Sequence, residues 1–173
     1  MQGAEGGDRP ADTARGLYNN GGLYGERLGW HLPGAPDASW ARTASLKSDR
    51  PGVRWYRTTA RLDLPEGADT ALGLRIEDAG GRTGKYRVQI FVNGWNTGQY
   101  VNDVGPQQEF VIPSGFLEPH GENTVALAVT AEQSGVGPDS VRLVNQGTVL
   151  GGVPAGQNAA PGYAAVRDRR TGR

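Results

Sequence analysis

Cysteine is absent from the chain of 173 residues, so disulfide bonds, thiolate zinc sites and a cysteine nucleophile are excluded. Long apolar runs are absent as well: no stretch of about 18 residues is fit to span a bilayer. The first thirty residues lack the apolar core of a signal peptide. Charge of one sign is not in excess either, because 18 acidic residues offset 18 basic ones. We therefore expect a soluble chain without an export signal, which binds neither nucleic acid nor a membrane.

The chain also lacks any amphipathic helix of three turns, and shows a twofold alternation of apolar residues instead. Turn residues separate the alternating stretches. The strands predicted in this way are residues 55–64, 71–78, 86–92, 109–113, 123–131 and 140–150. With long links at 79–84 and 101–108, they predict an all-β fold, an antiparallel jelly-roll β-sandwich.

The alternation also assigns side chains to faces. Val141, Leu143 and Val149 fall on one face if the last strand is regular. Asn93-Gly94 is the dipeptide preferred by a two-residue hairpin turn with positive φ at both central residues. This predicts a tight hairpin there that needs no ligand to explain it.

The two ends of the chain differ in composition from its middle. Residues 1–16 combine Gly, Ala and charged residues without periodicity, and residues 153–173 are rich in Gly, Pro and Ala and end in "RDRRTGR". We expect a flexible N-terminal segment at 1–16, one β domain at 17–152 and a flexible basic tail at 153–173.

Catalytic candidates are few. A nucleophilic Ser or Thr needs a base, and neither His31 nor His120 lies in a recognisable nucleophile setting. Glycoside hydrolysis needs two carboxylates that face one substrate, but Glu77 and Asp78 are successive strand residues whose side chains point to opposite faces. These carboxylates either end the strand or bind a structural cation such as calcium at the rim of the sandwich. No other metal and no cofactor is expected.

Aromatic residues in loop-like surroundings are the remaining candidates for binding. The C–H face of a sugar stacks on exposed aromatic rings, while amide and charged side chains bind its hydroxyls. Packing in a core or an interface is the alternative for each tryptophan, and Trp55 is expected in the core. The candidate carbohydrate-binding residues are Trp30, His31, Trp40, Trp95, Asn96 and Tyr100.

Three stretches follow one another along residues 14–152: "NNGGLYGERLGWHLPG", "WYRTTARLDLPEGAD" and "YRVQIFVNGWNTGQYVNDVGPQQEFVIPSGFLEPHGENTVALAV". Their order resembles the C-terminal jelly-roll region of the multidomain β-galactosidases of glycoside hydrolase family 35. The resemblance implies a galactose-binding-like sandwich. It also implies a non-catalytic module, because the catalytic glutamates of that family lie on a (β/α)8 barrel that nothing here resembles.

The expected function is therefore that of an accessory module in galactoside metabolism. Its expected partners are a catalytic barrel or other domains of a parent β-galactosidase, together with a galactoside bound weakly. The alternative is a free-standing lectin-like domain that binds galactosides. Members of the family are commonly secreted, so a chain without a signal is expected to be a detached or truncated C-terminal piece.

Overall fold

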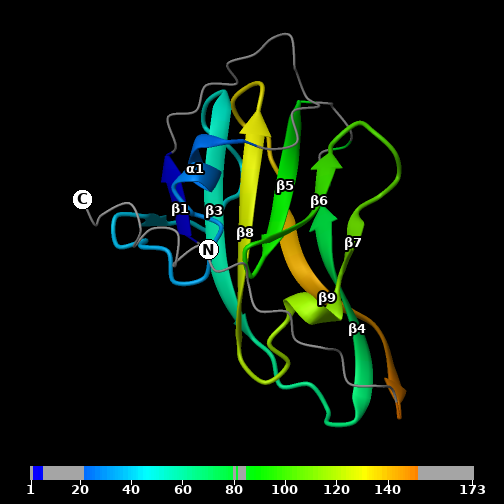
Figure 1. The fold of residues 1–173 in the computed structure, drawn as a ribbon. Helices are drawn as coiled ribbons and strands as arrows, with labels where there is room; N and C mark the ends of the chain where they lie inside the picture. The colour runs from blue at the N-terminus through cyan, green and yellow to red at the C-terminus, as the bar shows by residue number, and fades with distance from the viewer. Residues whose placement is uncertain (1, 6–21, 80, 82–84, 152–173) are drawn as a thin grey trace, which may run out of the picture.

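The computed structural model describes residues 2–5, 22–79, 81 and 85–151, and Figure 1 shows their arrangement. Strands dominate this part of the chain, with two short helical turns between them. The elements in order are β1 (Gln2–Glu5), α1 (Tyr24–Arg27), β2 (Ala41–Arg42), β3 (Gly52–Arg61), β4 (Ala68–Glu77), β5 (Tyr86–Val92), β6 (Trp95–Val101), β7 (Glu109–Ile112), the 3-10 helix η2 (Ser114–Phe116), β8 (Glu122–Ala131) and β9 (Ser140–Leu150). In the described ranges, no helix is long and apolar enough to cross a membrane.

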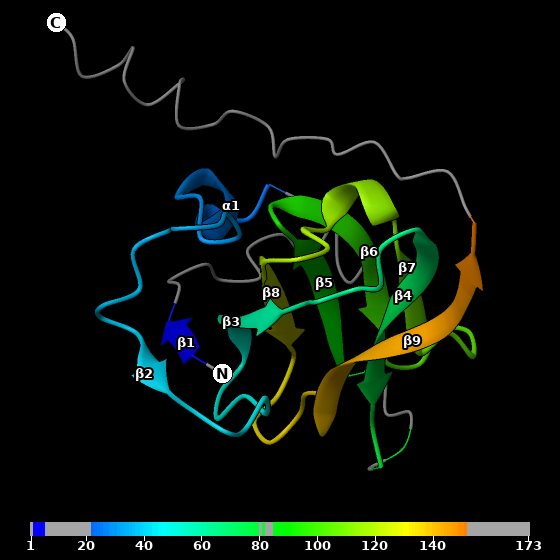
Figure 2. The same cartoon turned by 90° about the horizontal axis from the view of Figure 1, so that it is seen from below.

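The strands form two sheets that pack face to face (Figure 2). The large sheet has the order β2-β1-β3-β8-β5-β6, and the small sheet has the order β7-β4-β9. Every strand pair is antiparallel. The links from β4 to β5 and from β6 to β7 both pass from one sheet to the other, as the lengths of 79–84 and 101–108 predicted. The predicted all-β antiparallel sandwich is confirmed.

The main core lies between the two sheets and follows the alternation of the strands. In β5 the inward side chains include Val88 and Ile90, and in β8 they include Leu127 and Val129. They meet Leu74 and its inward neighbours from β4. Full burial of one such side chain stabilises the fold by about 1.5–3 kcal/mol, so this layer is the main source of stability.

The hairpin between β5 and β6 has the geometry predicted for its turn. Asn93 has φ 48° and Gly94 has φ 87°, so both central residues are left-handed. The Asn93 side chain also leaves the turn and donates to the carbonyl of Phe116 (2.7 Å) and to Oδ1 of Asn123 (2.8 Å). The hairpin is thereby tied to the loop that precedes β8.

A bulge in β9 overturns one assignment of the sequence analysis. The register shifts between Ala71 and Leu72 of β4, so that Gln146 of β9 is left over in the ladder. Beyond this extra residue the two faces of β9 are exchanged. Val149 therefore points outward and is 67% exposed, whereas Leu143 before the bulge packs on the core. The expectation that Val149 shares the face of Leu143 was wrong.

The N-terminal region also differs from its expectation. Gln2–Glu5, assigned to a flexible segment spanning 1–16, form β1 between β2 and β3, where they pair with Ala41–Arg42 and with Arg54–Arg57. Backbone pairing needs no apolar periodicity, which is why the composition did not reveal this strand. The remainder of 1–16 and the predicted tail at 153–173 lie outside the described residues.

Candidate functional site

A second cluster of buried side chains lies on the face of the large sheet that points away from the small sheet. Trp55 of β3 and Phe91 of β5 stack with ring centroids 5.5 Å apart. The strand between them, β8, places only Ala126 and Ala128 under the rings. These short side chains leave room for the two rings to meet across β8, so Trp55 is core, as expected.

The segment that contains α1 covers this aromatic face (Figures 1 and 2). Gly25 of α1 lies against the Trp55 ring, and a Cβ at this position would also come within 2.6 Å of Cε3 of Trp30. Trp30 makes edge-to-face contacts with Trp40, Trp55 and Tyr24, at centroid distances of 5.7, 6.2 and 5.9 Å. A glycine is therefore required where the helical turn meets the rings.

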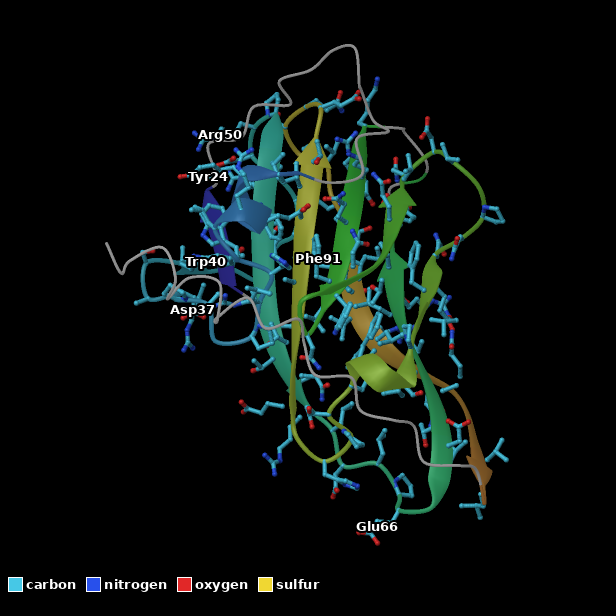
Figure 3. The ribbon with its side chains drawn as sticks, viewed as in Figure 1. Tyr24, Asp37, Trp40, Arg50, Glu66 and Phe91 are labelled. Carbon is cyan, nitrogen blue, oxygen red and sulfur yellow. The ribbon has the colours of Figure 1, made fainter. Side chains whose placement is uncertain are left out.

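Arg57 holds the chain that follows this helical turn. Its guanidinium is 8% exposed and forms an ion pair with Asp37 (2.9 Å). It donates to the carbonyls of Trp30 (3.3 Å) and Ala35, and lies 5.0 Å from the ring centroid of Trp40. Figure 3 shows Asp37 and Trp40 on the same side of the molecule, beside β1 and β3. One buried cation thus fixes both tryptophans that the sequence analysis selected here.

His31 belongs to the same cluster. Its ring lies 5.0 Å from Phe91 and 6.4 Å from Trp55, and burial lowers the pKa of its imidazole from the ordinary value. The other histidine, His120, lies in an exposed turn, as expected, with Nδ1 3.1 Å from the carboxylate of Asp63. His31 is therefore a packed ring and His120 a surface residue.

The lowered pKa of His31 predicts a loss of stability in mild acid. The unfolded chain binds a proton at His31 near pH 6.5, whereas the folded chain resists protonation until a lower pH, so the free energy of unfolding falls as pH decreases from 7.5 to 5.5. Urea denaturation across this range should show the decrease. H31F keeps a ring but cannot titrate, so it should flatten this decrease in the free energy of unfolding. H120Q should retain the decrease. An unchanged slope in H31F would contradict this assignment.

A groove of about 950 Å³ opens beside the aromatic cluster. Trp30 and Trp40, both selected from the sequence, line it together. The sequence analysis did not select the other lining residues, because they come from the segment before β2, from β2 and β3 and from the loop between these strands, and carry no common motif. These are Pro36, Ala38, Ser39, Ala41, Thr43, Ser45, Lys47, Asp49, Arg54 and Tyr56.

The charged groups of the groove are paired. Arg54 binds the carboxylate of Asp49, and Nζ of Lys47 lies 2.6 Å from a carboxylate oxygen of Asp139. Nε of Arg54 also donates to the hydroxyl of Ser48 (3.1 Å). The wall therefore presents oriented donors and acceptors without an excess charge.

Four of the six candidate carbohydrate-binding residues do not line this groove: His31, which packs against Phe91, together with Trp95, Asn96 and Tyr100. Trp95 stacks on Phe116 with a centroid distance of 5.0 Å and an interplanar angle of 9°. Oδ1 of Asn96 accepts from the backbone N–H of Gly98 (3.0 Å), within its own strand. Tyr100 is 2% exposed in the core between the sheets and so presents no surface to a ligand. The six candidates thus do not form one site.

Glu77 and Asp78 point to opposite sides, as expected of successive strand residues. The Glu77 carboxylate accepts from Ser140 (2.8 Å) and Arg142 (2.6 Å), and these partners hold its pKa below the ordinary value. Asp78 accepts from the hydroxyl of Tyr86 (2.7 Å), and this bond together with burial raises the pKa of Tyr86. Among the described residues, no group of three or more His, Cys, Asp or Glu side chains is placed to hold a metal ion.

Comparisons with known proteins agree with the resemblance noted in the motifs. A family model described as the β-galactosidase second all-beta domain matches residues 24–135. β-Galactosidase A of Penicillium sp is 41% identical over 87% of this chain and 15% of its own length. The probable β-galactosidase E of Aspergillus fumigatus is 40% identical over 88% of this chain and 14% of its own length.

A solved family 35 carbohydrate binding module from an environmental isolate is 14% identical, with a TM-score of 0.34, over 65% of this chain and 85% of the module. The chain spans about one seventh of the length of the curated relatives, so those proteins contain further domains. The matched domain is an accessory, non-catalytic part of glycoside hydrolases. The chain belongs to the family of the second all-beta domain of β-galactosidases.

Proposed function

We propose that the chain is a non-catalytic accessory module that packs against other domains of a β-galactosidase, the catalytic barrel first among them. The observation that carries this proposal is the bare outer face of the small sheet. The large sheet has its outer face covered by the segment around α1, whereas the small sheet has no described element over its own. An antiparallel sheet can leave one face in water, but large apolar side chains exposed on that face mark a site of protein contact.

The outer face of the small sheet is flat and partly apolar. Val111 of β7 is 62% exposed, and Val149 of β9 lies on the same side of the sheet. Between them are Ala71 and Gly73 of β4 and Gly147 of β9, and the Gln146 side chain lies over Gly73 and donates to the carboxylate of Glu109 (2.6 Å). Charged residues gather at the Glu77 end of β4. The face thus mixes apolar and polar groups, as the interfaces of non-obligate complexes do.

A non-catalytic role fits the chemistry of the groove. Glycoside hydrolysis by the usual mechanisms requires two carboxyl groups on either side of the scissile bond. Of the described lining residues of the groove, only Asp49 carries a carboxylate, and that carboxylate is paired with Arg54. Hydrolysis of a galactoside is accordingly assigned to another domain of the parent protein.

The packing proposal predicts that V111R weakens association with a β-galactosidase from which the equivalent domain has been removed. A guanidinium on this face, at the edge strand β7, would have to lose its hydration on binding, so we expect affinity to fall at least tenfold, or about 1.4 kcal/mol. Isothermal titration calorimetry with the truncated Penicillium relative measures the change.

V104R is the matched control, because Val104 is 52% exposed on the link after β6 rather than on the small sheet. It should bind as the unmodified chain does. Equal losses in the two variants would show that charge and not position weakens binding. Absence of binding by the unmodified chain would remove the proposal.

A second candidate function is direct contact with galactosides, with or without a parent protein. The observation that favours it is the groove itself, which combines two tryptophans with hydroxyl and charged side chains. Pockets of this size and composition are usual for small ligands.

A further inference from the structure

We infer that the groove beside β1 binds a short neutral oligosaccharide, with Trp30 and Trp40 on one wall and the segment from Thr43 to Asp49 on the other. This inference rests on the second candidate function and assigns it a place. It leaves the small-sheet face to protein packing, so one chain would bind sugar and a neighbouring domain at the same time.

The lining of the groove has the two kinds of group that saccharides require. The half-buried Trp30 supplies most of the aromatic surface for C–H groups, because Trp40 is 9% exposed and Tyr56, at 3%, packs in the main core. Hydroxyl and charged side chains supply donors and acceptors for sugar hydroxyls, and Ser39 and Thr43 are among them. A purely apolar ligand would leave these polar groups without partners, which disfavours it.

The charge balance favours a neutral ligand. Lys47 and Arg54 are each paired with a carboxylate, of Asp139 and Asp49 respectively. An anionic ligand would have to displace these carboxylates, and a cationic ligand would have to displace the basic partners. Sugar hydroxyls instead add hydrogen bonds to groups that stay paired, because each carboxylate and each guanidinium has more than one bonding position.

The backbone pairing of β1 argues against a peptide in the groove. A peptide that binds by strand addition needs a free sheet edge. β1 occupies the edges of β2 and β3 that face each other, since it pairs with Ala41–Arg42 on one side and Arg54–Arg57 on the other, and the outer edge of the sheet is offered only by the two residues of β2, too few for strand addition. Recognition in this groove therefore depends on side chains, as it does for sugars.

The walls are held in place before any ligand binds. The hydroxyl of Thr43 accepts from the N–H of Ser45 (3.1 Å), and the hydroxyl of Ser45 accepts from the N–H of Lys47 (3.2 Å). Two successive turns of this kind orient the polar wall. Arg57 fixes the opposite wall through Trp40 and the Trp30 carbonyl. Preorganised walls reduce the entropy lost when a ligand binds.

The test uses the indole N–H signals of the four tryptophans in the isotope-labelled full chain, followed by two-dimensional NMR during titration with lactose and with β-1,4-galactotriose. We expect the signals of Trp30 and Trp40 to move in a saturable way. Trp95, stacked on Phe116, is an internal control whose signal should stay in place. Tryptophan-to-phenylalanine variants assign the signals.

D49N provides the second measurement. The Asp49 side chain is 74% exposed, so the variant should fold normally, and the loss of its charge should raise the dissociation constant for galactotriose at least fivefold. D63N is the matched control, because Asp63 is also a largely exposed carboxylate, near His120, and does not line the groove. It should leave the dissociation constant unchanged, and equal effects of D49N and D63N would overturn the assignment.

Other outcomes distinguish the assignment of the groove from galactoside binding as such. Shifts confined to Trp95 would overturn the groove but keep galactoside binding as a function. No shift at any tryptophan up to about 50 mM sugar, where even a very weak site is half filled, would overturn both. If the Trp30 and Trp40 signals move with a peptide of residues 1–8 but not with sugar, the ligand of the groove is a peptide and not a saccharide.

Discussion

R57M should lower the free energy of unfolding by about 3 kcal/mol, because it removes a buried cation that binds several groups of the covering segment. The substitution leaves the carbonyls of Trp30 and Ala35 without their donor and removes the cation from the Trp40 ring. It also frees the Asp37 carboxylate, which is half exposed and regains water. Urea denaturation followed by circular dichroism measures the loss.

The same variant should shift tryptophan emission to longer wavelength before global unfolding, since Trp40 loses part of its cover. R142M is the matched control: Arg142 also pairs with a carboxylate, that of Glu77, but on the exposed outer face of the small sheet. Exposed pairs contribute at most about 1 kcal/mol, so R142M should be close to the unmodified protein. Similar losses in both variants would contradict the role given to Arg57.

N93A should be the most destabilising change in the β5–β6 hairpin, at about 3–4 kcal/mol. Alanine at φ 48° costs about 1–2 kcal/mol of backbone strain. In addition, the carbonyl of Phe116 loses its donor and the N–H of Thr124 loses its acceptor, the latter bond being 2.8 Å long. Each buried group left without a partner costs about 1 kcal/mol or more. Chemical denaturation of the purified variant gives the value.

N93G separates the two causes, because glycine accepts the left-handed backbone but forms none of the side-chain bonds. N93G should therefore lower the free energy of unfolding less than N93A does, and the difference should equal the backbone strain of alanine. N96A is a further control, since Asn96 bonds only the nearby Gly98 N–H on an exposed face. A loss in N96A as large as that in N93A would show that the hairpin is sensitive to any change.

The sequence predicted strand bounds best where turn residues flank the strand, as 79–84 and Asn93-Gly94 flank β5. The predicted bounds of β5 and β9 match the structure. By contrast β3, expected at 55–64, spans Gly52–Arg61. The prediction began at Trp55 and missed Val53, which alternates with Trp55 under the covering segment, while Gly52 and Arg54 between them are half-buried.

The candidate site was predicted only in part. Trp30 and Trp40 were selected from their loop-like surroundings and line one groove. Trp95 has similar surroundings in the sequence but lies against Phe116, and Tyr100 is in the core. In the sequence these tryptophans all lie near turns, so their surroundings do not tell a groove residue from a packed one. Which distant side chain each ring contacts decides that difference.

The fold class, the β5–β6 turn and the family follow from the amino-acid order, because alternation, the Asn-Gly pair and ordered motifs are local properties of the chain. The tertiary structure alone decided that Arg57 fastens the loop around Trp30 and Trp40 and that β1 fills the edge of β3. It alone also decided that a bulge turns Val149 outward. These features depend on contacts between residues far apart in the chain, and such contacts leave no periodic trace in one sequence.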